Sequence, residues 1–221
     1  MTTAIIGVGN IGSAVARHLV DGGEPVVLAA GKEPDASARA DELGPLASSA
    51  TISDAIKAAD VIVLAVWLDV LIAHQQNLIA EHADLLNGKI VTDTTNPMGF
   101  TSGGQLFRTL PHGQSSAQVV AAMLPAGAHH VKAFGTLAAP SLADSANRAP
   151  RRAVLFYATD DDRAAAAIER LITVAGFDPV KVGGVKDAGR IEMPGGDLHQ
   201  GGGLDGRLLD ADQADAAVAA A

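Results

Sequence analysis

Short apolar runs alternate along the chain with stretches whose apolar positions have helical spacing. The runs predict strands, in chain order, at 4–8, 25–29, 46–48, 61–66, 89–93, 130–134 and 153–157. The helical spacing predicts helices at 11–20, 33–43, 53–59, 71–87, 116–124, 161–175 and 211–221. Strands and helices that alternate on this scale predict an α/β fold with a doubly wound parallel sheet and right-handed crossovers.

Three segments give this prediction its detail. The run 61–66 is apolar without interruption, as expected for a central parallel strand that is covered on both faces. Pairs of Leu and Ile recur every seven residues from Leu71 to Leu86, which predicts one long amphipathic helix, and Ser53 is the expected cap of the helix before it. Glycines become frequent after residue 184. We therefore expect a domain over 1–184 and a short glycine-rich C-terminal segment over 185–221, packed on the same domain or on a partner subunit.

The composition and charge of the chain exclude several classes of protein. Of the 221 residues, 48% are hydrophobic and 19% are charged, which favours a folded core over disorder. No cysteine is present, so disulfides, thiolate nucleophiles and Cys-bound zinc are excluded. The net charge of −9 disfavours nucleic-acid binding, and no apolar run approaches the roughly 20 residues that span a bilayer. The start of the chain does not resemble a signal peptide, so we expect a cytoplasmic protein with neither nucleic acid nor membrane as a partner.

The motif G-V-G-N-I-G over residues 7–12 follows the first predicted strand directly and opens the first predicted helix. In this context Gly7 permits a tight turn, Gly9 lets a diphosphate approach the main chain, and Gly12 lets helix and strand pack closely. The free amides and the dipole at the helix start attract the anion. The motif predicts a Rossmann-type NAD(P)-binding fold; the alternative is a purely structural turn.

The second predicted strand bears on which dinucleotide is bound. NAD sites usually carry a carboxylate about 20 residues beyond the glycine motif, and none stands there. Gly31 and Lys32 follow instead, and the Lys32 ammonium is suited to pair with the 2'-phosphate of NADP. Glu33 and Asp35 dilute this charge, so a solvated Lys32 is the alternative. The pattern favours NADP(H) over NAD(H).

Four stretches together resemble the NADP-dependent coenzyme F420 reductases and related small dinucleotide-binding reductases, over residues 1–180. They are 7–13, 60–66, 93–97 and 131–136. The resemblance implies NADPH binding through the glycine loop and coenzyme F420 as co-substrate. Family members have Ser-Arg or Arg-Arg where this chain has Ala30-Gly31-Lys32, and the better-known F420 enzymes have a histidine where Gly135 stands. With the unfamiliar C-terminal segment, these departures suggest a separate branch whose acceptor differs.

Ligands of doubly wound sheets lie beyond the carboxyl ends of the strands. The expected cofactor-binding residues are Gly7, Val8, Gly9, Asn10, Ile11, Gly12, Gly31, Lys32, Ala65, Val66, Trp67, Thr95 and Asn96. The resemblance places Val66 beside the cofactor ribose and Thr95 and Asn96 at the nicotinamide. Trp67 either stacks on a flat acceptor ring or anchors a helix start. The catalytic residue is unknown, with Thr136 and His199 as candidates.

Other polar groups have two interpretations each. His18, His74 and His82 lie on predicted helices as solvated or core-lining residues, whereas the pair 129–130 could approach the site. His199 with Asp197 and Asp205 could form a lid, or a metal site, but the spacing matches no metal motif, so no metal is expected. The cluster Arg148, Arg151 and Arg152 either holds an anionic acceptor or is solvated. The pair Gly103-Gly104 predicts a mobile loop.

These observations favour an NADP(H)-dependent oxidoreductase that moves hydride between NADPH and a flat acceptor such as coenzyme F420 or a flavin. That chemistry requires orientation of two rings rather than an acid-base triad. The alternatives are an NADPH-dependent reductase of a small imine or carbonyl, with Thr136, His199 or Lys132 as proton donor, and a non-catalytic NADP(H)-sensing module. We expect a small-molecule redox substrate as partner and a possible homodimer, since Ala-rich helices can pack closely.

Overall fold

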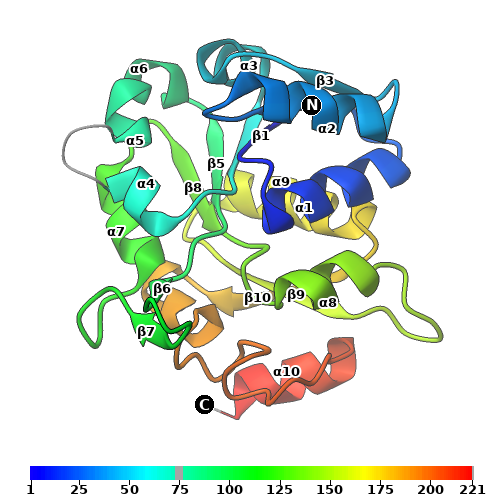
Figure 1. Ribbon diagram of the computed structural model, residues 1–221. Helices are drawn as coiled ribbons and strands as arrows, with labels where there is room; N and C mark the ends of the chain where they lie inside the picture. Colours follow the sequence, from blue (N-terminus) through cyan, green and yellow to red (C-terminus); the bar gives the residue numbers. More distant parts are fainter. Residues whose placement is uncertain (73–76, 221) are drawn as a thin grey trace.

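The computed structural model describes residues 1–72 and 77–220, and one mixed sheet runs through its centre (Figure 1). The sheet has the strand order β10-β9-β8-β5-β4-β1-β2-β3. Its strands are β1 (Thr3–Ile6), β2 (Val26–Ala29), β3 (Ala47–Ser49), β4 (Val61–Leu64), β5 (Ile90–Asp93), β8 (His129–Lys132), β9 (Val154–Ala158) and β10 (Asp178–Gly183). Six neighbouring strands, in the order β8-β5-β4-β1-β2-β3, are parallel to one another. This is the order of a doubly wound dinucleotide-binding sheet. The expected fold class is confirmed.

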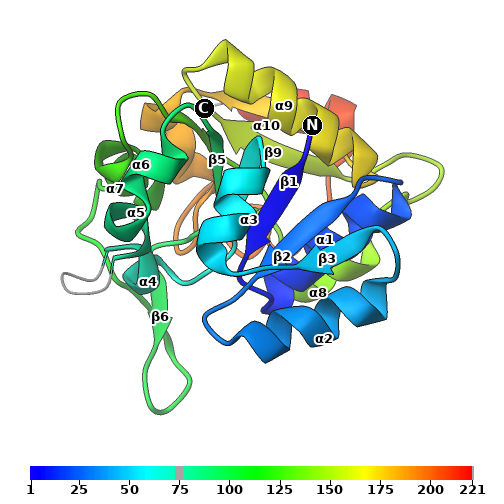
Figure 2. The ribbon, with the colours of Figure 1, turned by 90° about the horizontal axis from the view of Figure 1, so that it is seen from above.

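Helices cover both faces of the sheet (Figure 2). They are α1 (Asn10–Asp21), α2 (Glu33–Leu43), α3 (Ile52–Ala58), α4 (Leu68–Ile72), α5 (Leu78–Glu81), α6 (Ala83–Leu86), α7 (Ser116–Met123), α8 (Ala139–Asp144), α9 (Asp162–Val174), α10 (Ala211–Ala219) and the 3-10 helix η1 (Val185–Ile191). Val61 and Val63 of β4 pack into one apolar cluster with α1, α2 and α9, and Ile62 and Leu64 pack into a second with α3 and α5. This double burial explains why the run 61–66 contains no polar residue.

The sheet departs from the all-parallel expectation at one edge. β9 pairs antiparallel with β8, and β10 pairs parallel with β9, so these two strands run against the other six. The outer surface of this pair carries a third apolar cluster with η1, α10 and residues such as Leu198 and Leu204. Leu209 O accepts a hydrogen bond from Val154 N at 3.0 Å. The glycine-rich C-terminal segment therefore packs directly on the sheet.

The prediction of one long helix over 71–87 is wrong. The chain forms α4, α5 and α6 instead, and residues 73–76 of the prediction, with His74, lie outside the described residues. Asn77 Oδ1 accepts from the amides of Ile79 and Ala80 and so begins a new helix. His82 then separates α5 from α6 with φ −119°. The apolar pairs of the pattern are still buried at Leu71 and Leu86, so the periodicity identified the buried positions but not the interruptions between them.

Smaller differences concern caps and short elements. Thr51, not Ser53, caps α3, because its hydroxyl accepts from Asp54 N at 3.2 Å. The sequence pattern missed α8 and an antiparallel hairpin of β6 (Met98–Phe100) and β7 (Leu106–Arg108), with the expected loop glycines 103–104 at its turn. The hairpin projects from the body of the molecule (Figure 2). In the described part of the chain, no helix has the length and apolar character needed to cross a membrane.

Candidate functional site

The turn between β1 and α1 brings main-chain atoms closer than side chains would allow. Gly7 has φ +105°, and a Cβ placed on it would lie 2.3 Å from the carbonyl oxygen of Ala65. A Cβ on Gly12 would lie 1.9 Å from the carbonyl oxygen of Gly7. A Cβ on Gly9 would meet no atom within 4 Å. Gly7 and Gly12 are therefore required by the turn itself, whereas Gly9 faces open space.

The amino end of α1 lies at this open space. Gly9 is its N-cap, no side chain caps the helix, and its first turn carries no acidic residue. The Ser13 hydroxyl instead donates to Val8 O at 2.7 Å, which supports the turn from behind. The first amides and the positive end of the helix dipole thus remain for an anion from outside. A dinucleotide diphosphate fits this arrangement, since nothing on Gly9 obstructs its approach.

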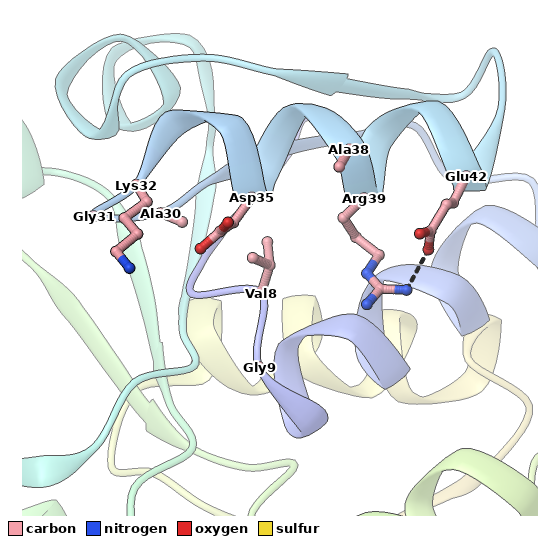
Figure 3. A pocket seen from close by; sticks show the side chains of 9 residues that line it. All are labelled: Val8, Gly9, Ala30, Gly31, Lys32, Asp35, Ala38, Arg39 and Glu42. Carbon is pink, nitrogen blue, oxygen red and sulfur yellow. Dashed lines mark hydrogen bonds and ion pairs between the residues drawn. The ribbon is translucent and has the colours of Figure 1, made fainter.

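Two cavities adjoin the turn, and both are lined by Val8 and Gly9. The first, of about 670 Å³, is also lined by Ala30, Gly31, Lys32, Asp35, Ala38, Arg39 and Glu42 (Figure 3). The second, of about 450 Å³, is also lined by Asn10, Ser13, Ala14, Arg17, His18, Arg39, Ala139, Pro140 and Ala143. Of the predicted residues, Val8, Gly9, Gly31 and Lys32 therefore lie around the first cavity, Asn10 lines the second, and Gly7, Ile11 and Gly12 line neither.

Four charged residues of α2 and its start line the first cavity. In Figure 3, Lys32 lies at one end, the ion pair of Arg39 with Glu42 lies at the other, and Asp35 lies between them near Val8. Their formal charges cancel, so Asp35 opposes the anion affinity that Lys32 provides. The sequence prediction missed Arg39, although its position seven residues after Lys32, two turns along a helix, places both on one face.

The residues expected at the site from the ends of β4 and β5 line neither of these cavities, although Ala65 adjoins the glycine turn. Ala65 N donates to Ile6 O at 2.8 Å, which keeps the end of β4 beside the glycine turn. The Trp67 side chain is 54% exposed and meets the edge of Phe100 at 90°, with 6.3 Å between ring centroids. Trp67 directly precedes α4, where its carbonyl oxygen accepts from Val70 N, and it presents part of its aromatic surface to the outside.

The Asn96 side chain connects the loop after β5 to the loop after β8 and to the C-terminal segment. Its Nδ2 donates to Gly135 O at 2.9 Å, and its Oδ1 accepts from Met193 N at 2.8 Å. A Cβ on Gly135 would lie 2.4 Å from Thr94 O, so no histidine fits there without moving the loop after β5. Gly135 is thus explained by close packing of the two strand ends.

Thr136 and His199, the catalytic candidates, lie beside this contact and are buried. His199 Nδ1 accepts from Gly201 N at 3.0 Å, so its Nε2 donates to Gly135 O at 3.1 Å. Burial lowers the pKa of His199 to about 4, and the nearby charge of Lys132 acts in the same direction. The hydrogen bond to Gly135 raises this pKa, but by less. His199 is therefore a neutral packed residue, and the lid expectation is wrong. The Thr136 hydroxyl has no hydrogen-bond partner within the described structure.

Two of the remaining histidine candidates, His18 and His129, have hydrogen-bond partners, whereas neither ring nitrogen of His130 has one within the described residues. His18 lines the second cavity, but its ring bonds to Leu142 O at 2.8 Å. His129 pairs with Asp161 at 2.6 Å at the amino end of β8, the edge opposite to the glycine turn. His130 is buried, with Nε2 3.8 Å from Asp93 Oδ2. Across residues 1–72 and 77–220, no group of three or more His, Asp or Glu is arranged to hold a metal.

Two of the three arginines of the cluster contact the C-terminal segment, and the third contacts α9. Arg151 forms ion pairs with Asp210 and Asp212 at the start of α10. Arg148 donates to Leu208 O at 3.3 Å, and Arg152 donates to Thr173 O at 3.4 Å. Of the two interpretations of the cluster, these exposed contacts favour the solvated one over the holding of an anionic acceptor.

Comparison with known proteins agrees with the geometry. The family model of the coenzyme F420-dependent NADP oxidoreductases matches residues 2–97. A hypothetical protein from Sinorhizobium meliloti is 30% identical, with a TM-score of 0.78 and 96% of both chains covered. A candidate F420-dependent NADP reductase from Arthrobacter sp. FB24 is 25% identical, with a TM-score of 0.71, over 85% of this chain and 87% of that one. The chain is therefore similar to this family of NADP oxidoreductases over residues 2–97, and to these two proteins over most of its length.

The two matches confirm the resemblance seen in the sequence, and they indicate an NAD(P)-dependent oxidoreductase. A more distant likeness is to a reductive aminase from Aspergillus terreus, in complex with an NADPH-type cofactor, cyclohexanone and allyl amine. It is 23% identical with a TM-score of 0.61, over 87% of this chain and 57% of the aminase. That likeness shows the fold alone, and the chain spans little more than half the length of the aminase.

The glycine geometry predicts that two Ala substitutions in one motif act differently. Gly12→Ala should lower the free energy of unfolding by about 2 kcal/mol or more, because the new methyl group meets Gly7 O. Gly9→Ala should cost less than about 1 kcal/mol, because its methyl group enters open space, and should weaken NADPH binding. Urea unfolding and NADPH titration measure the two effects. Equal stability of both variants would contradict the assigned contacts.

The His199 environment predicts a pH-dependent stability. Its pKa is lowered from 6.5 in the unfolded chain to about 4, so its contribution is fully present above pH 6.5 and is lost as the pH falls toward 4. We expect a loss of about 2 kcal/mol between pH 7 and pH 5 from this residue. Denaturant unfolding at both pH values should show a smaller loss for His199→Gln than for the natural protein. An unchanged pH dependence in the variant would refute this environment.

Proposed function

We propose that this protein binds NADP(H) at the turn between β1 and α1 and transfers hydride between NADPH and a flat redox acceptor such as coenzyme F420 or a flavin. The observation that carries the proposal is the open approach at Gly9, beside a helix start that no side chain caps. The match of residues 2–97 to the model of the coenzyme F420-dependent NADP oxidoreductases supports the choice of cofactor. The bound nicotinamide would donate or accept the hydride.

The side chains have separate tasks in this proposal. The amides at the start of α1 bind the diphosphate, and Lys32 meets the 2'-phosphate in the first cavity. Thr95 and Asn96 border the nicotinamide, held there by their bonds to neighbouring segments. Trp67 and Phe100 offer exposed aromatic surfaces on which a flat acceptor can lie. The protein then contributes orientation, which is the main requirement for hydride transfer between two rings.

Reduction of a small imine or carbonyl is the second candidate, because a reductive aminase complex and an imine reductase from Pseudomonas sp. share the fold. That reaction requires a proton donor near the nicotinamide. Of the three donors expected from the sequence, His199 is neutral with both ring nitrogens bonded, and Lys132 is buried among oxygen acceptors. The Thr136 hydroxyl has no bonded partner among the described residues but is fully buried, away from the lining of both cavities. These placements favour the flat acceptor.

Charge substitutions in the first cavity test the cofactor preference. Asp35→Asn should raise the NADPH-to-NADH affinity ratio by about threefold to tenfold, because the carboxylate opposes the 2'-phosphate. Lys32→Ala should lower the ratio by a similar factor. Glu33→Gln is the matched control, since this exposed carboxylate at the start of α2 does not line the cavity. Calorimetric titration with both cofactors measures the ratios. Equal ratios in all four proteins would remove the assignment of Lys32 and Asp35.

Single-turnover kinetics test the acceptor. The protein with bound NADPH is mixed with coenzyme F420, FMN or a panel of cyclic imines and ketones, and the loss of nicotinamide absorbance is followed. We expect rapid oxidation by a flat acceptor, and Trp67→Ala should slow it by about tenfold while NADPH affinity is kept. Oxidation by imines or ketones alone would support the second candidate. Tight NADPH binding without oxidation by any compound would favour a sensor.

A further inference from the structure

A cluster of charged groups is buried directly behind Thr95. The side chains of Lys132, Asp93 and Glu192 are each at most 1% exposed. Lys132 Nζ lies 3.1 Å from Asp93 Oδ2, 2.8 Å from Ser116 Oγ and 3.5 Å from Glu192 Oε1, and it also donates to the carbonyl oxygen of Thr95. Buried ions with this many partners are retained only where the geometry is well satisfied. The cluster joins β5, β8, α7 and the C-terminal segment.

Glu192 lies 76 residues after Ser116 in the chain and joins this cluster from the C-terminal segment. Its Oε2 accepts from Ser116 N at 2.9 Å, and its Oε1 accepts from Ala117 N at 2.9 Å and from Ser116 Oγ at 2.8 Å. The carboxylate thereby satisfies the first amides of α7 and lies at the positive end of the helix dipole. The C-terminal segment thus supplies both a helix cap and a counter-ion.

The charges in the cluster are balanced by their surroundings. Burial alone would raise the pKa of Asp93, but the charge of Lys132 and the contacts with His130 outweigh it and hold this pKa well below its usual range. Lys132 and the amino end of α7 compensate the two carboxylates between them. Without the charge of Glu192, Lys132 and the first amides of α7 lose part of their electrostatic compensation. The residues that Lys132 and Ser116 contact are then expected to shift.

The main chain of Thr95 is fixed from both sides by this cluster. Its amide donates to Asp93 Oδ1 at 2.7 Å, and its carbonyl oxygen accepts from Lys132 and lies 3.1 Å from Ser116 Oγ. The next residue, Asn96, accepts from Met193 N, which is adjacent to Glu192 in the chain. The loop after β5 is therefore bound to the C-terminal segment directly at Asn96, and Thr95 is linked to Glu192 through Lys132 and Ser116.

We propose that Glu192 is a positioning residue for the nicotinamide end of the cofactor. It holds Lys132 and Ser116, and these hold the loop of Thr95 and Asn96 in place. The inference rests on the proposed function, in which that loop borders the nicotinamide. Ser116 is fully buried, so the cluster does not act as a serine nucleophile with a lysine base. Glu192 acts through the loop and does not touch the cofactor.

The test compares two ligands that share the adenosine end. NADPH carries a nicotinamide, whereas 2',5'-ADP carries the same adenosine with its 2'- and 5'-phosphates and lacks the nicotinamide. Glu192→Gln should weaken NADPH binding by about tenfold and leave 2',5'-ADP affinity within about twofold, because the glycine turn and Lys32 are not in contact with the cluster. Asp197→Asn is the matched control. It removes a carboxylate of the same segment that is exposed and pairs with Arg190 at the surface.

Ser116→Ala is a second, milder variant, which removes one hydroxyl between Lys132, Glu192 and Thr95 O. It should reduce the advantage of NADPH over 2',5'-ADP in the same direction and keeps the test decisive if Glu192→Gln does not fold. An advantage equal to that of the natural protein in every folded variant overturns the role of Glu192. Absence of binding of either ligand to the natural protein would instead overturn the proposed function.

Discussion

The main-chain contact between Gly7 and Gly12 is the constraint on which the site depends. It lets the first turn of α1 lie against the end of β1, while the approach of Gly7 to Ala65 keeps the end of β4 at the same place. Because both contacts are between backbone atoms, the helix start is held at the sheet edge without any side chain. This leaves the helix amides and the space at Gly9 available for an anion, and the cavities on either side follow from that arrangement.

Much of this part could be predicted from the sequence, because it depends on local signals. The glycine spacing defined the turn, and the apolar run 61–66 identified the central strand, since burial on both faces excludes polar residues. Helix boundaries inside 71–87 could not be predicted from periodicity, because the interruption at Asn77 comes from a side-chain cap that the heptad pattern does not reveal. The reversal of β9 was missed for a similar reason, since strand direction depends on the preceding connection and not on the composition of the strand.

The chemistry of the site was less predictable than its location. Lys132, Asp93 and Glu192 lie in three segments that the sequence separates by up to 99 residues, and their pairing results from the order of the strands and the return of the C-terminal segment. His199 was a reasonable candidate as a histidine among glycines, but its burial and its two hydrogen bonds depend on how that segment folds over Gly135. Arg39 was the exception, because its helical spacing from Lys32 was visible in advance.

The return of the C-terminal segment also limits how such proteins can be recombined. The segment brings its own carboxylate into the interior, and the ammonium and the helix start that it satisfies belong to the preceding domain. A chimaera that takes residues 185–221 from a relative without an acidic side chain at position 192 would enclose an ammonium with one counter-ion fewer. Positions 116, 132 and 192 should therefore be inherited as one unit when domains of this family are exchanged.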